Sequence, residues 1–329
     1  MKTAQLYCTA LEMIQDMGLS GFDASVIQHI RAASRTVEHE IGSFIPSSET
    51  RYFSGGREIL RIDPALAISK VVNDGVEVTD YVRIPESPPW SNGPFNALKR
   101  LLGWAANGVQ ITGSWGKYNE IVELGINATL AMGELQITVT NGAKLAPGMV
   151  LKIEDEQILI ISGAGSEESP APTAAISTLT SFVEESDLLI PVSNGSEFFS
   201  GETIQIGLED LFIRKVAENM LYVTRGWNHT PQAALQSGST VKVYRSYGID
   251  RGMNGTIDAA HANVALQRYA VPEDVNWLCR QIAGLMHLKA ESKFAGRIGS
   301  TETGEAGYYS EFPPNQIDRV RNHYKVWTL

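Results

Sequence analysis

The stretch LQITVTNGAKLAPGMVLKIEDEQILI, residues 135–160, decides how the middle of this chain is interpreted, because a second stretch matches it without gaps. The match is LLIPVSNGSEFFSGETIQIGLEDLFI, residues 188–213, at an offset of 53 residues. Both stretches combine β-branched residues with an Asn-Gly pair, a pattern typical of short strands and tight turns. The repeat therefore predicts a duplicated β unit.

A second pair of stretches recurs at a different offset. RGWNHTPQAA at 225–234 matches RGMNGTIDAA at 251–260, and this offset is 26 residues. Unequal offsets exclude a simple tandem and indicate that one copy lies inside the other. We therefore expect an outer module, residues 125–170 and 246–270, interrupted by an inner module, residues 171–245. Each is expected to be a β sandwich or small barrel; an incomplete third copy is the alternative.

Helical patterns flank this insert. Apolar residues recur at helical spacing after Asp23 and again after Pro272. Between the first helices and the insert, shorter period-two runs predict hairpins. The sequence thus predicts an α+β protein with a small helical-bundle core, residues 1–124 and 271–329, and short β-hairpins, plus the inserted all-β domain of two nested repeats. The side chains expected in the helical core are Val26, Ile30, Val37, Leu278, Ile282 and Leu285.

Composition limits the function classes. The chain has 329 residues, 43% of them hydrophobic, so it is long enough to bury cores, and its formal net charge of -10 opposes attraction of free nucleic acid. No apolar run approaches the about 20 residues that span a bilayer, so no membrane association is expected. Cys8 and Cys279 are too far apart in sequence to form a metal or redox motif, and two cysteines are too few for a disulfide scaffold.

No motif for nucleophilic, zinc or phosphate chemistry is present, so we expect neither an enzyme nor a cofactor, and no catalytic or metal site. The acidic run 154–156 is interpreted as a turn, with a metal site as the less favoured alternative. Arg225 and Arg251 each precede a glycine at equivalent positions of the repeat. We expect both to fix a loop through hydrogen bonds to backbone carbonyls or to an acid of the same repeat. His229 and His261 do not occupy equivalent positions.

The parts outside the insert show a family resemblance. The order of RAASRTVEHEIG (31–42), ETRYFSGG (49–56), VTDYV (78–82) and VQITGSWG (109–116), followed by VPED (271–274) opening a helix, resembles the head-tail adaptor proteins of tailed bacteriophages, also called head completion or connector proteins. The similarity covers about residues 19–118 and 270–325. The insert is itself similar to a small module of phage structural proteins, whereas ordinary adaptors are much shorter.

The resemblance implies a structural virion protein that forms a ring of twelve subunits, a dodecamer, in the virion neck after assembly in the host cytoplasm. Its implied partners are further copies of the chain, the portal protein, and the stopper or tail terminator protein, with genomic DNA passing through the lumen without sequence recognition. The segment 312–329 is expected to dock on the portal, although it could instead fold back on its own subunit. The expected docking residues are Phe312, Ile317, Val320, Tyr324, Val326, Trp327 and Leu329.

The competing expectation is a tail or collar decoration protein that binds host-surface carbohydrate through its β modules. In that case Tyr222, Trp227 and Tyr244 would form an aromatic platform for a sugar ring. A place in the protein core is the more common role for aromatic residues that alternate along strands.

Overall fold

A computed structural model describes residues 2–86, 94–166, 169–173, 176–291, 297–298, 307–308 and 314–325. The chain is mostly β, with 38% strand and 22% helix, and the described part holds four helices and three large antiparallel sheets without a helical-bundle core. The expectation of an α+β fold built on a helical bundle is therefore wrong. The physical reason is that the segment from β1 to β6, which was expected to form short hairpins, pairs into one six-stranded sheet. This sheet has its own apolar core.

This N-terminal sheet has the strand order β1-β6-β2-β5-β4, with β3 paired to β2. Its strands are β1 (Ser47–Phe53), β2 (Ile59–Asn73), β3 (Val76–Glu77), β4 (Val82–Ile84), β5 (Phe95–Lys99) and β6 (Val109–Trp115). Alternate residues of β6 are buried, so one face of the sheet is apolar. Leu60, Leu98 and Ile111 lie at the centre of the core on that face. A closed apolar core explains why this region does not depend on the helices for burial.

The outer and inner modules have the same topology. The outer sheet has the order β7-β18-β9-β10-β17-β8, and the inner sheet β11-β16-β13-β14-β15-β12. At offsets of 53 and 26 residues these strands correspond one to one. The outer strands are β7 (Ile121–Leu130), β8 (Gln136–Thr138), β9 (Val150–Ile153), β10 (Glu156–Ser162), β17 (Ser246–Asp250) and β18 (His261–Tyr269). The inner strands are β11 (Ser177–Thr178), β12 (Leu189–Pro191), β13 (Thr203–Ile206), β14 (Glu209–Ala217), β15 (Met220–Trp227) and β16 (Thr240–Val243).

The helices form a layer over the β modules. They are α1 (Ala10–Met17), α2 (Ala24–Ile41), α3 (Glu273–Glu291) and α4 (Pro314–His323). Thr9 and Glu12 form a capping box at the start of α1, and Asp23 caps α2. A core of buried residues joins these helices to both modules, because it also contains Val150 of the outer module and Trp227 of the inner one. The short strands β19 (Arg297–Ile298) and β20 (Gly307–Tyr308) pair between α3 and α4.

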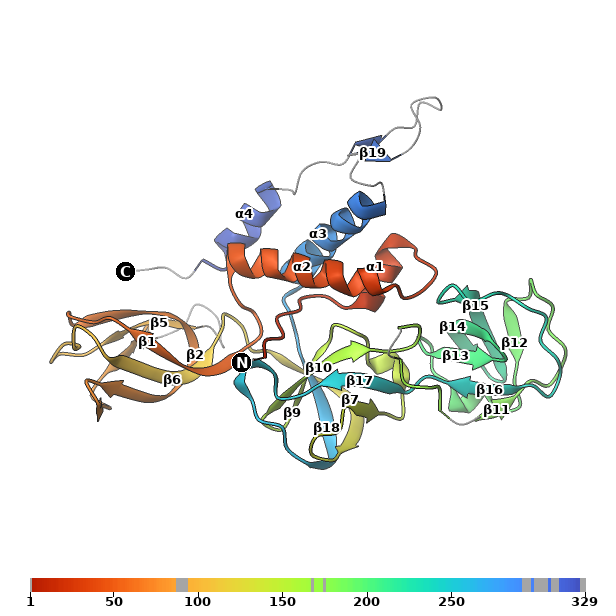
Figure 1. Cartoon of the computed structure of the whole chain (residues 1–329), viewed down its shortest axis with the longest axis horizontal. Coiled ribbons are helices and arrows are strands. Elements are labelled where there is room, and N and C mark those ends of the chain that lie inside the picture. The colour runs from red at the N-terminus through yellow and green to blue at the C-terminus, as the bar shows by residue number, and fades with distance from the viewer. Residues whose placement is uncertain are drawn as a thin grey trace.

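Figure 1 shows the three sheets side by side along the long axis of the molecule, with the outer module in the middle. The helices lie above this central module, and the inner module projects to the side opposite the N-terminal sheet. Within the described ranges, no helix is both long and apolar enough to cross a bilayer. The central position of the outer module brings the N-terminal segment, α3 and α4 together around one recess.

Candidate functional site

A cleft of about 1130 Å³ lies between the helical layer and the outer module. It is lined by the N-terminal segment, by the ends of β9 and β18, by the start of α3 and by α4. Its wall combines apolar and charged side chains, among them Leu6, Tyr269, Trp277 and Arg319. Trp277 is 42% exposed, so its ring offers apolar surface at this wall. A half-open recess of this composition suits a macromolecular contact.

Asp274 organises one side of this cleft. It lies in the first turn of α3, where its Oδ1 accepts the backbone N–H of Val275 at 2.9 Å. The same oxygen accepts the hydroxyl of Tyr324 at 2.9 Å, and Oδ2 lies 3.0 Å from Nδ1 of His323. Burial and the hydrogen bond to Asp274 raise the pKa of Tyr324. The phenol therefore stays protonated and acts as an anchor for the end of α4.

Other contacts tie α4 to its own subunit. Lys117 donates to the carbonyl oxygens of Ile41 and Tyr324, at 2.5 and 3.0 Å. Arg321 pairs with Glu40 on α2. Tyr324 is only 7% exposed and packs edge-on against Phe44, so this expected docking residue is buried against its own chain.

The other residues expected to dock on the portal divide into two groups. Val320 is buried and Ile317 packs on the same core, so both are occupied within the chain. The remaining four, Phe312, Val326, Trp327 and Leu329, lie outside the described residues. Of the expected core residues, Val26, Ile30, Val37, Leu278 and Ile282 are fully buried and Leu285 is half-buried. These core side chains are enclosed within the chain and offer little surface to a neighbouring subunit.

The two repeat arginines have equivalent surroundings. Arg251 forms a two-pronged ion pair with Glu156, at 3.0 and 2.6 Å, and donates to the carbonyl oxygens of Ala131 and Ala259. Both side chains of the pair are almost fully buried. Bidentate contacts of this kind fix geometry as well as charge, so the arginine sets the shape of the loop that follows it.

Arg225 repeats these contacts in the inner module. Its partner is Glu209, with both distances 2.7 Å, and it donates to the carbonyl oxygens of Glu184, Asp187 and Ala233. The partners correspond at the offsets of the sequence repeat. The pair is thus a property of the module.

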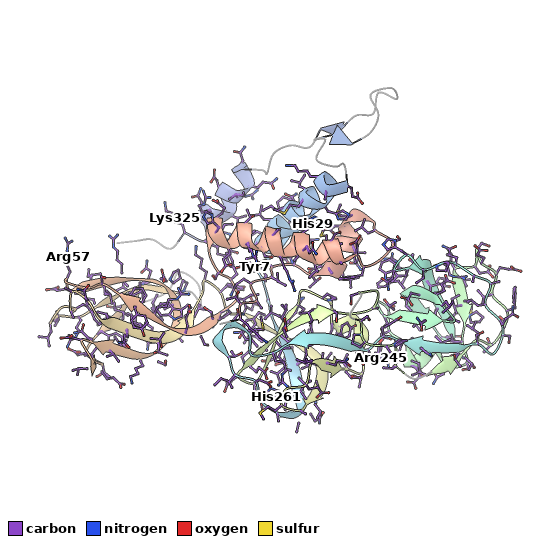
Figure 2. The ribbon with its side chains drawn as sticks, in the orientation of Figure 1. Tyr7, His29, Arg57, Arg245, His261 and Lys325 are labelled. Carbon is purple, nitrogen blue, oxygen red and sulfur yellow. The ribbon has the colours of Figure 1, made fainter. Side chains whose placement is uncertain are left out.

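His261, which the sequence comparison noted only as having no equivalent histidine in the inner repeat, is a member of the outer cluster. It is 3% exposed, and its two ring nitrogens lie 2.9 Å from Glu154 and 2.8 Å from Glu156. Figure 2 shows it low in the outer module, away from the helical layer. Burial acts to raise the pKa of Glu156, but the hydrogen bonds from Arg251 and His261 outweigh burial and lower it. The acidic run that was interpreted as a turn therefore contains a buried ion-pair partner.

The two cysteines meet although they are far apart in sequence. Cys8 and Cys279 are free thiols, and their sulfurs lie 3.4 Å apart in the core, because the N-terminal segment packs against α3.

The aromatic platform expected for a sugar ring does not form. Trp227 is 4% exposed and stacks on Phe212, and Tyr244 is buried with its hydroxyl on Asp210. Among the residues that the structure describes, no group of three or more His, Cys, Asp or Glu side chains is arranged to hold a metal ion.

Comparison with known proteins gives this chain no relative from which a role could be transferred. No family model, curated protein or solved structure matches it.

Proposed function

We propose that this chain is a structural subunit of a head-tail adaptor ring, which joins the portal of a tailed bacteriophage to its stopper or tail. The resemblance of residues 19–118 and 270–325 supports this role and implies twelve copies around a DNA channel. A net charge of -10 is compatible with such a channel, because basic contacts to phosphates are what make DNA adhere.

The observation that carries the proposal is that the chain has two unlike surfaces suited to protein contact. One is the concave cleft with Trp277 on its wall. The other is a convex turn after β5, in which Leu101 and Leu102 are 82% and 80% exposed. A head-to-tail contact between unlike surfaces generates a ring when the rotation closes, whereas a two-fold dimer uses one surface twice.

The neighbourhood of the turn extends its apolar surface. Lys99 pairs with Ile59 on one side and with Val82 on the other, so these two side chains share one face of the N-terminal sheet. Ile59 is 44% exposed and Val82 is 48% exposed. Several exposed apolar groups on one face of a domain mark an interaction site. We assign this surface, Ile59, Val82, Leu101 and Leu102, to the contact between neighbouring subunits.

Co-assembly with the portal protein from the same genome tests the proposal. The purified full chain is mixed with the portal and imaged by electron microscopy, alongside the double variant L101E/L102E. The wild type should stack as a ring on the portal. The variant should lose the ring, because each contact between neighbouring subunits would bury two carboxylates without partners.

The matched control is the double variant L208E/I257E, since Leu208 and Ile257 are each 84% exposed but lie on the β modules. This control should assemble like the wild type. Failure of the folded wild type to associate with the portal would contradict the adaptor role. Normal rings from L101E/L102E would contradict the assignment of the subunit contact while leaving the adaptor role in place.

A further inference from the structure

Two equivalent asparagines, Asn228 and Asn254, make the same contacts with unrelated segments of the chain. The backbone N–H of Asn254 donates to the carbonyl oxygen of Lys2 at 2.8 Å, and its Oδ1 accepts the N–H of Ala4 at 2.8 Å. Its Nδ2 also donates to the carbonyl oxygen of Ala4 at 3.2 Å, a contact that Asn228 does not share. The outer module therefore holds main-chain groups of Lys2 and Ala4, two residues apart, with one asparagine.

The inner module repeats this arrangement. The N–H of Asn228 donates to the carbonyl oxygen of Ser20 at 2.9 Å, and its Oδ1 accepts the N–H of Phe22 at 3.0 Å. Each turn thus binds the carbonyl oxygen of one residue and the N–H of the second residue after it, although Lys-Thr-Ala and Ser-Gly-Phe share no residue.

The geometry of the turn prepares each asparagine for this contact. Asn228 and Asn254 have φ of 54° and 51°, in the left-handed region that asparagine tolerates better than most residues. The preceding glycines are fixed by the buried ion pairs, because Gly226 donates to Glu209 at 3.0 Å and Gly252 donates to Glu156 at 3.1 Å. The donor and acceptor of the asparagine are therefore in place independently of the segment that they hold.

The threonine that ends each turn fixes it from the other side. Thr230 accepts the N–H of Asp210, and Thr256 accepts the N–H of Gln157, both at 2.9 Å. These contacts are again equivalent at the offsets of the repeat. The Arg-Gly-x-Asn-x-Thr turn is thus fixed by the same contacts in both modules. In each copy it presents the backbone N–H and the Oδ1 of its asparagine in the same way.

The bound segments indicate which ligands the turn accepts. The third residue is buried in both cases, with Ala4 1% and Phe22 8% exposed, whereas the first is exposed. The middle residue distinguishes the two modules. Thr3 is exposed in the outer module, but a Cβ on Gly21 would lie 2.3 Å from the backbone nitrogen of Asn228, so the inner module requires glycine there.

We propose that the Arg-Gly-x-Asn-x-Thr turn of each module is a main-chain binding site for a three-residue peptide segment whose third residue is apolar. Residues 2–4 fill the outer site and residues 20–22 fill the inner site. The modules use these sites to hold the N-terminal region against the insert. This inference does not depend on the adaptor role.

Hydrogen exchange of the full chain, measured by mass spectrometry, tests the proposal. Asn254→Gly keeps the backbone N–H and tolerates positive φ, but removes the side-chain acceptor. It should speed exchange of the Ala4 amide about tenfold, the effect expected for one hydrogen bond, and leave Phe22 unchanged. Asn228→Gly should do the reverse. Asn263→Gly is the matched control, because Asn263 also has positive φ, 51°, but holds neither segment.

A second measurement asks whether the outer site binds peptide in trans. A chain lacking residues 1–4 is mixed with a peptide of those residues at millimolar concentration, and saturation-transfer NMR reports binding. The shortened chain should bind the peptide, and the same chain with Asn254→Gly should not. Equal binding by both chains, or unchanged exchange of Ala4 and Phe22 in the two variants, would overturn the proposal.

Discussion

The outer and inner modules share one topology and one buried Arg-Glu pair, but they differ in what surrounds that pair. In the outer module His261 contacts Glu156 through a ring nitrogen, whereas Leu235 occupies the equivalent position of the inner module and contributes to an apolar core. The outer module lies under the helices, between the other two sheets (Figure 1). The buried Arg-Glu pair is thus a common feature of both modules, whereas the histidine contact is specific to the outer module.

The contact between the modules is also polar. Arg245, at the junction in Figure 2, pairs with Glu202 at 2.7 Å, and Glu202 also accepts the N–H of Gly142 in the outer module. Glu202 is fully buried as a side chain. This ion pair bridges the two copies at the point where the chain leaves the inner module and re-enters the outer one. It therefore fixes how one copy is nested in the other.

The largest expected effect comes from breaking the shared pair. Arg251→Ala and Arg225→Ala each leave a buried carboxylate without its partner, which costs about 3–5 kcal/mol in the free energy of unfolding. Module-resolved hydrogen exchange should show loss of protection in the outer module for the first variant and in the inner module for the second. Arg214→Ala, which removes an exposed arginine of the inner module, is the control and should change little. A cost below about 1 kcal/mol for either buried arginine would contradict its structural role.

An intermediate effect is expected from making the outer module resemble the inner one. His261→Leu removes two hydrogen bonds to carboxylates but leaves Glu156 paired with Arg251, so the outer module should lose about 1–3 kcal/mol. The loss should be confined to the outer module in the same exchange experiment. His39→Leu is the control, because the His39 side chain is 85% exposed. An equal or greater loss than for Arg251→Ala would mean that the histidine, and not the arginine, holds the cluster together.

The smallest effect is a difference in pH response. The pKa of Glu156 is lowered in the folded chain, so its stabilising contribution is present above the unfolded value of about 4.5 and is lost as pH falls through the folded value. Burial raises the pKa of Asp210 in the inner module, against hydrogen bonds from Asn228 and Tyr244. Its contribution has the opposite sign: it is fully present below the unfolded value of 3.8 and is lost as pH rises through the folded value.

Acidification from pH 5 toward pH 3 should therefore weaken the outer module more than the inner one. Exchange rates corrected for intrinsic pH dependence measure this difference. Asp210→Asn should reduce it, because the asparagine does not titrate. Equal destabilisation of both modules in the wild type would contradict this assignment of the two carboxylates.

The sequence predicted the duplicated β modules of the insert, but it did not predict that the N-terminal segment, α3 and α4 would line one cleft. The offsets of 53 and 26 residues identify Arg225 with Arg251, and the structure gives these arginines equivalent partners, because a repeated sequence repeats its local contacts. The helical bundle was a wrong expectation because period-two runs do not reveal how many strands will pair. Residues 59–73 form one long strand, β2, which pairs with β3, β5 and β6 within a single sheet.

By itself, the sequence determined which residues are equivalent in the two modules, since equivalence is a property of order and spacing alone. Only the tertiary structure decided which distant segments these modules hold, such as Ala4 on Asn254, 250 positions away. It also decided that Cys8 meets Cys279 and that Tyr324 returns to Asp274. The physical reason is that such contacts arise from the packing of complete elements against one another, and local periodicity carries no record of that packing.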